Sequence, residues 1–130
     1  MNEIARKCLY LTREEKIRLI NLLNESMDES EINDKRFEIL YKAATDVVGQ
    51  GIKTKIKDYP LVVGRKMIAY QMRQEGYSLQ AIGKQLVRHH ASIIHLEKSM
   101  KEVLQYPHVF KLEMAWWQEF QKKVKEYEVN

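Results

Sequence analysis

Residues 78–98 read SLQAIGKQLVRHHASIIHLEK, and their spacing predicts two short helices joined by a tight turn. Ser78 suits an N-cap, because its hydroxyl can accept a hydrogen bond from an amide of the first turn. The apolar positions behind it recur at helical spacing at Leu79, Ile82 and Leu86. A turn over residues 83–88 and a second helix from about His89 complete the pattern. This arrangement is what a helix-turn-helix requires.

The second predicted helix has a polar beginning and an apolar packing side, and it stops before Pro107. Its packing positions are predicted to be Ile93, Ile94, Leu96, Met100, Val103 and Leu104. His95 is expected to pack on the helix interior with a backbone partner, whereas His89 and His90 are expected to be exposed.

The polar beginning of this helix has the chemistry needed to contact DNA. Arg88 can reach a phosphate, while His89 and His90 can donate hydrogen bonds to base acceptors. Ser92 can bond in either direction, and Ala91 can accommodate a thymine methyl group.

Helical periodicity extends on both sides of this segment. Thr12–Glu15 has the form of a capping box, and it predicts a helix that ends near Met27. The polar run 28–31 predicts a loop, after which Asn33 or Asp34 would cap a second helix. Gly49 and Gly51 are expected to stop that second helix.

The run 52–57 alternates Ile, Lys and Thr, but no partner strand is evident, so we interpret it as a basic linker. A helix is then expected from about Pro60 to Gly76. A last helix has three- and four-residue steps through Val109, Leu112, Trp116, Phe120, Val124 and Tyr127.

Composition agrees with an all-α fold. The chain has 130 residues, which suits one ordinary domain, and it contains only 5 Gly and 2 Pro. We expect an N-terminal helical pair over 1–51, a basic linker over 52–59, and a helix-turn-helix domain with a C-terminal aromatic helix over 60–130.

The positive charge of the chain is concentrated in its middle. The formal net charge is +4 overall, but residues 52–104 hold ten Lys and Arg against four Asp and Glu, for a net charge of +6. Residues 1–51 have a net charge of −2. Uneven basic charge of this kind points to a polyanionic partner, of which nucleic acid is the first candidate.

Three blocks resemble the C-terminal DNA-binding domain of the bacterial replication initiator DnaA. They are RKMIAY at 65–70, SLQAIG at 78–83 and RHHASIIH at 88–95. That family reads approximately RQ(M/I)AM, SLxxIG and GGRDHTTVxH. The resemblance spans about residues 62–105, and it implies a helix-turn-helix of the DnaA or Trp-repressor kind that binds double-stranded DNA.

The resemblance also implies roles for individual residues. Arg65 would contact the minor groove, Leu79 and Gln80 the DNA backbone, and Arg88 a phosphate, with residues 90–92 in the major groove. The full set expected to contact DNA is Arg65, Lys66, Ser78, Leu79, Gln80, Lys84, Arg88, His89, His90, Ala91, Ser92 and Lys98.

Several positions depart from the family pattern. His89 replaces an aspartate, Ala91 replaces a threonine, and the loop before Arg88 is shorter and lacks two glycines. We therefore expect duplex DNA binding without assuming the usual DNA box of the family. The expected role is that of a replication-associated or regulatory factor of a bacterium or its mobile elements.

Other chemistries find little support in the sequence. GQGIKTK at 49–55 does not satisfy the phosphate-binding pattern GxxxxGK(S/T), and no apolar strand precedes it. His89, His90 and His95 lack the spacing that lets two imidazoles share a metal ion. No nucleophile, base and orienting group form a set. We expect no enzyme activity, no cofactor and no metal.

The expected location is the cytoplasm. The single cysteine, Cys8, allows no internal disulfide, the first residues lack the pattern of a signal peptide, and no apolar run is long enough to span a membrane.

An alternative interpretation is a protein-interaction module that uses its amphipathic terminal helices, with a non-specific basic segment. Trp116 and Trp117 are adjacent, so they point roughly 100° apart on a helix and are hard to bury together in one small core. A protein partner or self-association through Trp116, Trp117, Phe120 or the N-terminal helices is therefore a second expectation.

Overall fold

The structure is a computed structural model that describes residues 26–129, with side chains described from residue 34 onward. Within this range every regular element is a helix, and there is no strand. The helices are α2 (Ser26–Val48), α3 (Tyr59–Gln74), α4 (Leu79–Leu86), α5 (His90–Gln105) and α6 (Lys111–Val129). The all-α prediction is confirmed for this part of the chain. The capping box at Thr12–Glu15, nearly all of the helix predicted after it, and Cys8 lie outside the described residues.

The long helix α2 differs from its prediction at its start. It already runs through residues 28–31, where a loop was expected, so a cap at Asn33 or Asp34 is wrong. No Gly or Pro occurs between residues 26 and 48, so the backbone meets no helix-breaking residue there. The helix ends at Val48, and Gly49 follows it with a φ of 99°, as the predicted glycine stop requires.

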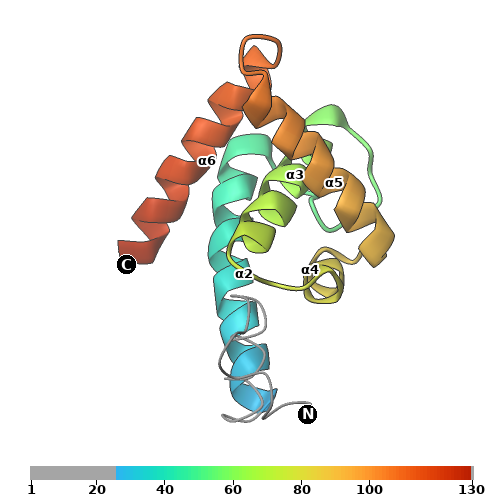
Figure 1. Ribbon diagram of the computed structural model, residues 1–130. Helices are drawn as coiled ribbons and strands as arrows, with labels where there is room; N and C mark the ends of the chain where they lie inside the picture. The colour runs from blue at the N-terminus through green and yellow to red at the C-terminus, as the bar shows by residue number, and fades with distance from the viewer. Residues whose placement is uncertain (1–25, 130) are drawn as a thin grey trace, which may run out of the picture.

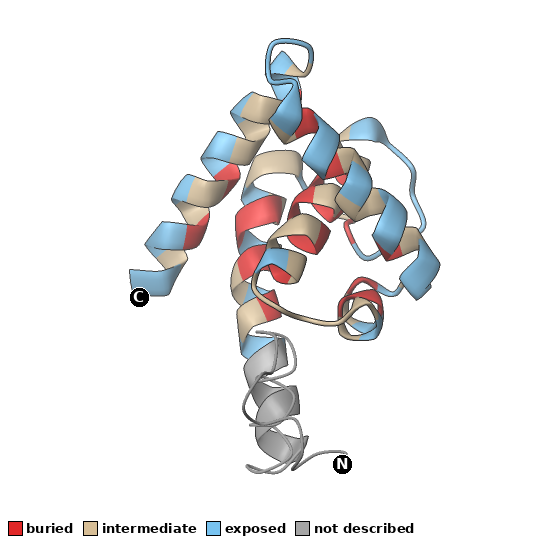
Figure 2. Ribbon diagram, viewed as in Figure 1, coloured by how far each residue is buried: buried red, intermediate tan, exposed pale blue. Residues whose placement is uncertain are grey.

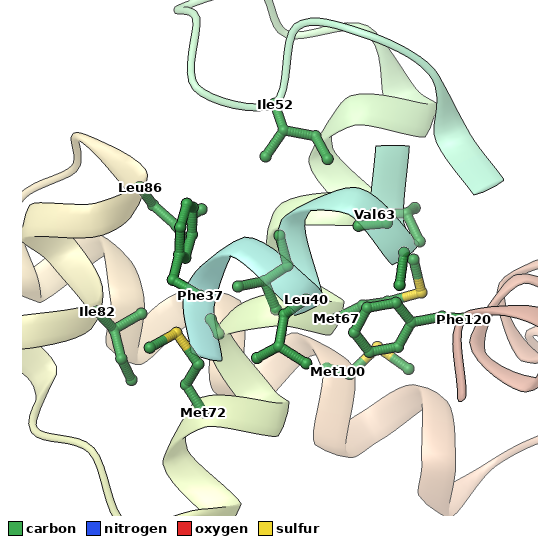
Figure 3. Close-up of a cluster of buried hydrophobic side chains, with 14 of the residues drawn as sticks. Phe37, Leu40, Ile52, Val63, Met67, Met72, Ile82, Leu86, Met100 and Phe120 are labelled. Carbon is green, nitrogen blue, oxygen red and sulfur yellow. The ribbon is translucent and has the colours of Figure 1, made fainter. Parts of the chain in front are cut away.

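The core is formed jointly by all five described helices. α3 lies between α2 and α5, α6 runs along α2, and α4 packs against α5 (Figure 1). Figure 3 shows Leu40, Met67, Met100 and Phe120, from α2, α3, α5 and α6, pointing toward one another. On each helix the buried residues face this centre and the exposed residues face away from it (Figure 2).

The segment predicted as a basic linker is irregular, but it is anchored in the core. Ile52 is fully buried, and it joins the same cluster as residues of α2 and α3. The packing is therefore continuous from α2 through this loop into α3, and the described residues show no break in the core between residues 51 and 60.

The helix α3 begins at Tyr59, one residue before Pro60, and Gly76 follows its end with a φ of 98°. The predicted helix from about Pro60 to Gly76 is confirmed. Proline is well placed here, because the amide that it lacks has no partner in the first turn of a helix.

The aromatic residues of α6 lie against α3 and the core. The ring of Trp117 meets Tyr70 edge-on at 5.7 Å between centroids, and it lies 5.5 Å from Phe120. Trp116 lies 6.2 Å from Tyr59. Both tryptophans are half-buried and Phe120 is fully buried. The helix thus accommodates two adjacent tryptophans, because α3 supplies a separate aromatic partner for each.

The start of the predicted last helix is wrong. Val109 precedes α6 and is 73% exposed, and Leu112 is 53% exposed, so neither belongs to the core. Phe120 and Val124 are buried as predicted. The chain turns between α5 and α6 at residues 106–110, which places the first residues of the expected stripe at a corner of the molecule (Figure 1).

One arginine joins three helices at the surface. Arg36 on α2 donates two hydrogen bonds to the carboxylate of Glu75, which follows α3, and a third of 2.6 Å to Glu128 on α6. The hydrogen bond to Glu75 is the main cause that raises the pKa of Arg36 above its ordinary value.

None of the described helices combines the length and the apolar character that crossing a bilayer requires.

Candidate nucleic-acid interface

Three residues, Val87 to His89, separate α4 from α5. Ser78 caps α4 as predicted, and its hydroxyl oxygen accepts a hydrogen bond from the amide of Ala81 at 3.1 Å. Val87 ends α4 in the left-handed region, with a φ of 58°. The turn is therefore shorter than the predicted range 83–88.

Gly83 lies inside α4 rather than in the turn, and it allows the backbone of the turn to approach α4 closely. A Cβ atom at this position would lie 2.5 Å from the carbonyl oxygen of Arg88. The amide of Arg88 donates a 2.8 Å hydrogen bond to the carbonyl of Gly83. The absence of a side chain at Gly83 thus lets the chain fold back tightly on α4 before α5 begins.

Two stacked histidines form the beginning of α5. His89 is the N-cap, and its Nδ1 atom accepts a hydrogen bond from the amide of Ala91 at 3.1 Å. The ring of His90 stacks on that of His89, with 4.3 Å between centroids. Both side chains are exposed, as predicted. The cap satisfies one of the amides that a helix start leaves without an intrahelical partner.

The outward face of α5 differs from the predicted one. Ile93, Met100 and Val103 are buried, as expected, but Ile94 is 36% exposed. His95 is exposed as well, so its predicted interior position is wrong. Successive helical residues are roughly 100° apart, so Ile94 and His95 cannot share the inward direction of Ile93.

The remaining predicted contacts on α4 and α5 are distributed over surface and core. Gln80 and Lys84 on α4 are exposed, as are Ala91 and Lys98 on α5. Ser78, Leu79 and Ser92 are half-buried, and Leu79 packs against the core. Ser92 also donates its amide to the carbonyl of His89 at 2.9 Å.

Lys66 on α3 is half-buried. Its Nζ atom lies 6.0 Å from the centroid of the Tyr59 ring, and burial lowers its pKa below the ordinary value, an effect that Glu102 opposes. Lys66 is thus less available to a ligand than the exposed lysines of α4 and α5.

Arg65 is an internal residue, contrary to its expected contact with the minor groove. Its side chain is 3% exposed. Its Nε atom donates a hydrogen bond to the carbonyl of Ile52 at 2.6 Å. Its Nη2 atom donates to the backbone carbonyls of Thr54 at 2.9 Å and of Gly51 at 3.2 Å. Burial, and then the charge of Arg88, lower its pKa. The guanidinium is thus committed to the loop before α3.

Arg88 is half-buried, and it links the same loop to the turn. It donates hydrogen bonds to the carbonyls of Leu86 at the end of α4 and of Val87 in the turn, and another to the carbonyl of Thr54 in the loop. The carbonyl of Thr54 therefore accepts hydrogen bonds from both Arg65 and Arg88. These hydrogen bonds fix the loop next to the beginning of α5 (Figure 1).

This loop carries three exposed lysines that were not among the predicted contacts: Lys53, Lys55 and Lys57. The Nζ atom of Lys53 lies 5.1 Å and 5.3 Å from the ring centroids of Phe37 and Tyr41 on α2. The alternate spacing of the three lysines is visible in the sequence. Their proximity to the turn is not, because it depends on the hydrogen bond between Arg88 and Thr54, which are 34 residues apart.

Within residues 34–129, no group of three or more His, Cys, Asp or Glu side chains is arranged to hold a metal ion. Comparison with protein families, with curated proteins and with solved structures gives no match for this chain.

Proposed function

We propose that this protein binds double-stranded DNA, with α4 and α5 acting as a DnaA-like helix-turn-helix and α5 as the helix that enters the major groove. Its role would be that of a replication-associated or regulatory factor that carries out no catalysis. The observation that carries the proposal is the outward face of α5, which begins directly after a three-residue turn and carries the exposed residues His90, Ala91, Ile94, His95 and Lys98.

The dimensions of this face suit a groove. An α-helix with its side chains is about 10–12 Å wide, and the major groove of B-form DNA is about 12 Å wide. In helix-turn-helix proteins the N-terminal residues of the second helix contact base edges, while the first helix crosses the backbone. The exposed start of α5 and the exposed residues of α4 support the same assignment here.

Cations on three elements would contact the phosphates. Lys84 lies on α4, Lys98 on α5, and Lys53, Lys55 and Lys57 lie on the loop that Arg88 attaches to the turn. Phosphate contacts fix the orientation of a protein on the duplex, and they supply most of its salt-dependent affinity. We leave Arg65 out of the contact set, because its guanidinium is buried among loop carbonyls.

The proposal can be tested by titrating a labelled random duplex at several salt concentrations. Loss of two phosphate contacts in a Lys84→Ala, Lys98→Ala double variant should reduce the slope of log K against log salt by about 2. The matched control is the Lys122→Ala, Lys125→Ala double variant, which removes the same charge from exposed positions of α6. Equal slopes in the two double variants, or wild-type affinity that does not change with salt, would contradict DNA binding through this face.

The alternative is a protein-interaction module, and one observation favours it. Tyr106, Val109 and Leu112 are all at least half exposed around the corner between α5 and α6. Trp116, Trp117 and Phe120, by contrast, are occupied by contacts with the core and α3. Concentration-dependent self-association that a Val109→Ser, Leu112→Ser variant abolishes, without salt-dependent DNA affinity, would favour this alternative.

A further inference from the structure

We propose that Ala91, Ile94 and His95 form the base-reading stripe of α5, and that the bound duplex presents thymine methyl groups and a purine N7 acceptor to it. This inference rests on the proposed DNA binding, and it names the kind of base pair that the face would select.

The three residues form one stripe because of their spacing. They lie at positions i, i+3 and i+4, which share one face of an α-helix, and Lys98 at i+7 continues that face. All four are exposed, and the opposite direction is occupied by buried Ile93 and Met100. The step from Ala91 to His95 advances about 6 Å along the helix axis, or roughly two base pairs of DNA.

His90 and Ser92 are less well placed than the sequence suggests. The ring of His90 stacks on His89 at the very start of the helix. Ser92 is half-buried on the side of the helix that turns toward the core. The outward face therefore keeps Ala91 from the residues expected to read bases, and it adds Ile94 and His95 about one helical turn further along α5.

The chemistry of the stripe restricts its partners. Ile94 and Ala91 expose only methyl and methylene groups, and the thymine C5-methyl group is the apolar feature of the major groove. His95 makes no hydrogen bond within the described residues, so an imidazole N–H is available to a purine N7 or to guanine O6.

Carboxylate and amide side chains are missing from the beginning of this helix. Residues 90–96 read HASIIHL, with no Asp, Glu, Asn or Gln. These are the side chains that recognise cytosine N4 or that bind adenine through N6 and N7 together. The stripe should therefore favour thymine, and a purine contacted through its N7 atom, over cytosine in the strand that it contacts.

The test begins with a duplex selected by the wild-type protein from a random pool. Thymines are replaced one at a time by deoxyuridine, which removes only the methyl group, and purines by their 7-deaza analogues. We expect about a fourfold loss of wild-type affinity at one or two thymines, the equivalent of one buried methyl group. One 7-deaza position should weaken binding similarly.

Variants assign each effect to a residue. Ile94→Ala should lose sensitivity to one deoxyuridine, and His95→Ala should lose sensitivity to the 7-deaza purine. Gln105→Ala is the matched control at the exposed far end of the same helix, and it should retain both sensitivities. Urea denaturation of each variant checks that the fold is intact.

The outcomes separate the two proposals. If salt-dependent binding is present but no deoxyuridine or 7-deaza substitution matters, or if Ile94→Ala and His95→Ala keep the wild-type sensitivities, the stripe is wrong and DNA binding stands. If the wild-type protein binds no duplex at any salt concentration, both proposals fail.

Discussion

Replacing Gly83 with alanine should destabilise the protein, although alanine is the better helix former. The new Cβ atom would lie 2.5 Å from the carbonyl oxygen of Arg88, whereas close carbon–oxygen contacts in proteins are about 3.3–3.6 Å. The obstacle is backbone, so a side-chain rotation cannot relieve it. The turn before α5 must move away from α4 by most of an ångström.

The expected cost follows from three effects. Alanine in place of glycine inside a helix contributes about 1 kcal/mol in favour of the folded state. Overpacking costs about 1–3 kcal/mol, and weakening the 2.8 Å hydrogen bond from the Arg88 amide to the Gly83 carbonyl costs about 1 kcal/mol more. The free energy of unfolding should therefore fall by about 1–3 kcal/mol.

Urea denaturation followed by circular dichroism and by tryptophan fluorescence measures this change. With a slope of about 2 kcal/mol per molar urea, the midpoint should fall by about 0.5–1.5 M. Gln80→Ala is the control, because it changes an exposed residue of the same helix and should alter stability by less than about 0.5 kcal/mol. A Gly83→Ala protein as stable as the wild type would refute the close approach of α4 to the turn.

Three further substitutions test the turn, the loop and the surface ion pairs. Val87→Gly should raise the melting temperature. The left-handed backbone conformation costs a β-branched residue about 1–2 kcal/mol, which exceeds the entropic cost of glycine, about 0.5–1 kcal/mol. A lower melting temperature would contradict the backbone strain at Val87. Arg65→Met should lower the free energy of unfolding by about 2–4 kcal/mol and speed hydrogen exchange over residues 51–57, because it removes the donor to three loop carbonyls. Unchanged stability with weakened DNA binding would instead assign Arg65 to the groove. A double-mutant cycle of Arg36→Ala with Glu75→Gln should give a coupling energy of about 1 kcal/mol that decreases with added salt, because the pair is partly exposed. A coupling energy near zero would show that the contact adds nothing to stability.

Local sequence signals predicted the regular elements well. The apolar spacing of Ile82, Leu86 and Ile93 places these residues in the core, and Ser78 caps α4 as its side chain allows. Such signals succeed because helical periodicity and capping depend on residues within a few positions of one another. The same signals failed at residues 28–31, where a polar run continues a helix because nothing in it breaks one.

The outward face of α5 was harder to predict from the sequence. Ile93, Ile94 and Leu96 are equally apolar in the sequence, and the packing of α3 against α5 decides which of them turns inward. Ile94 and His95 therefore emerged as candidate contacts only when the orientation of the helix was known.

Local residue order and composition were enough to predict the helical character of the described residues, the cap at Ser78 and the basic middle segment. The role of Arg65 and the position of the lysine-bearing loop depend instead on packing between segments that are distant in sequence. Both depend on Thr54, whose carbonyl accepts hydrogen bonds from Arg65 and from Arg88, 34 residues further along the chain. A contact between residues so distant in sequence follows from the packing of the whole chain, and periodicity within a single helix does not encode it.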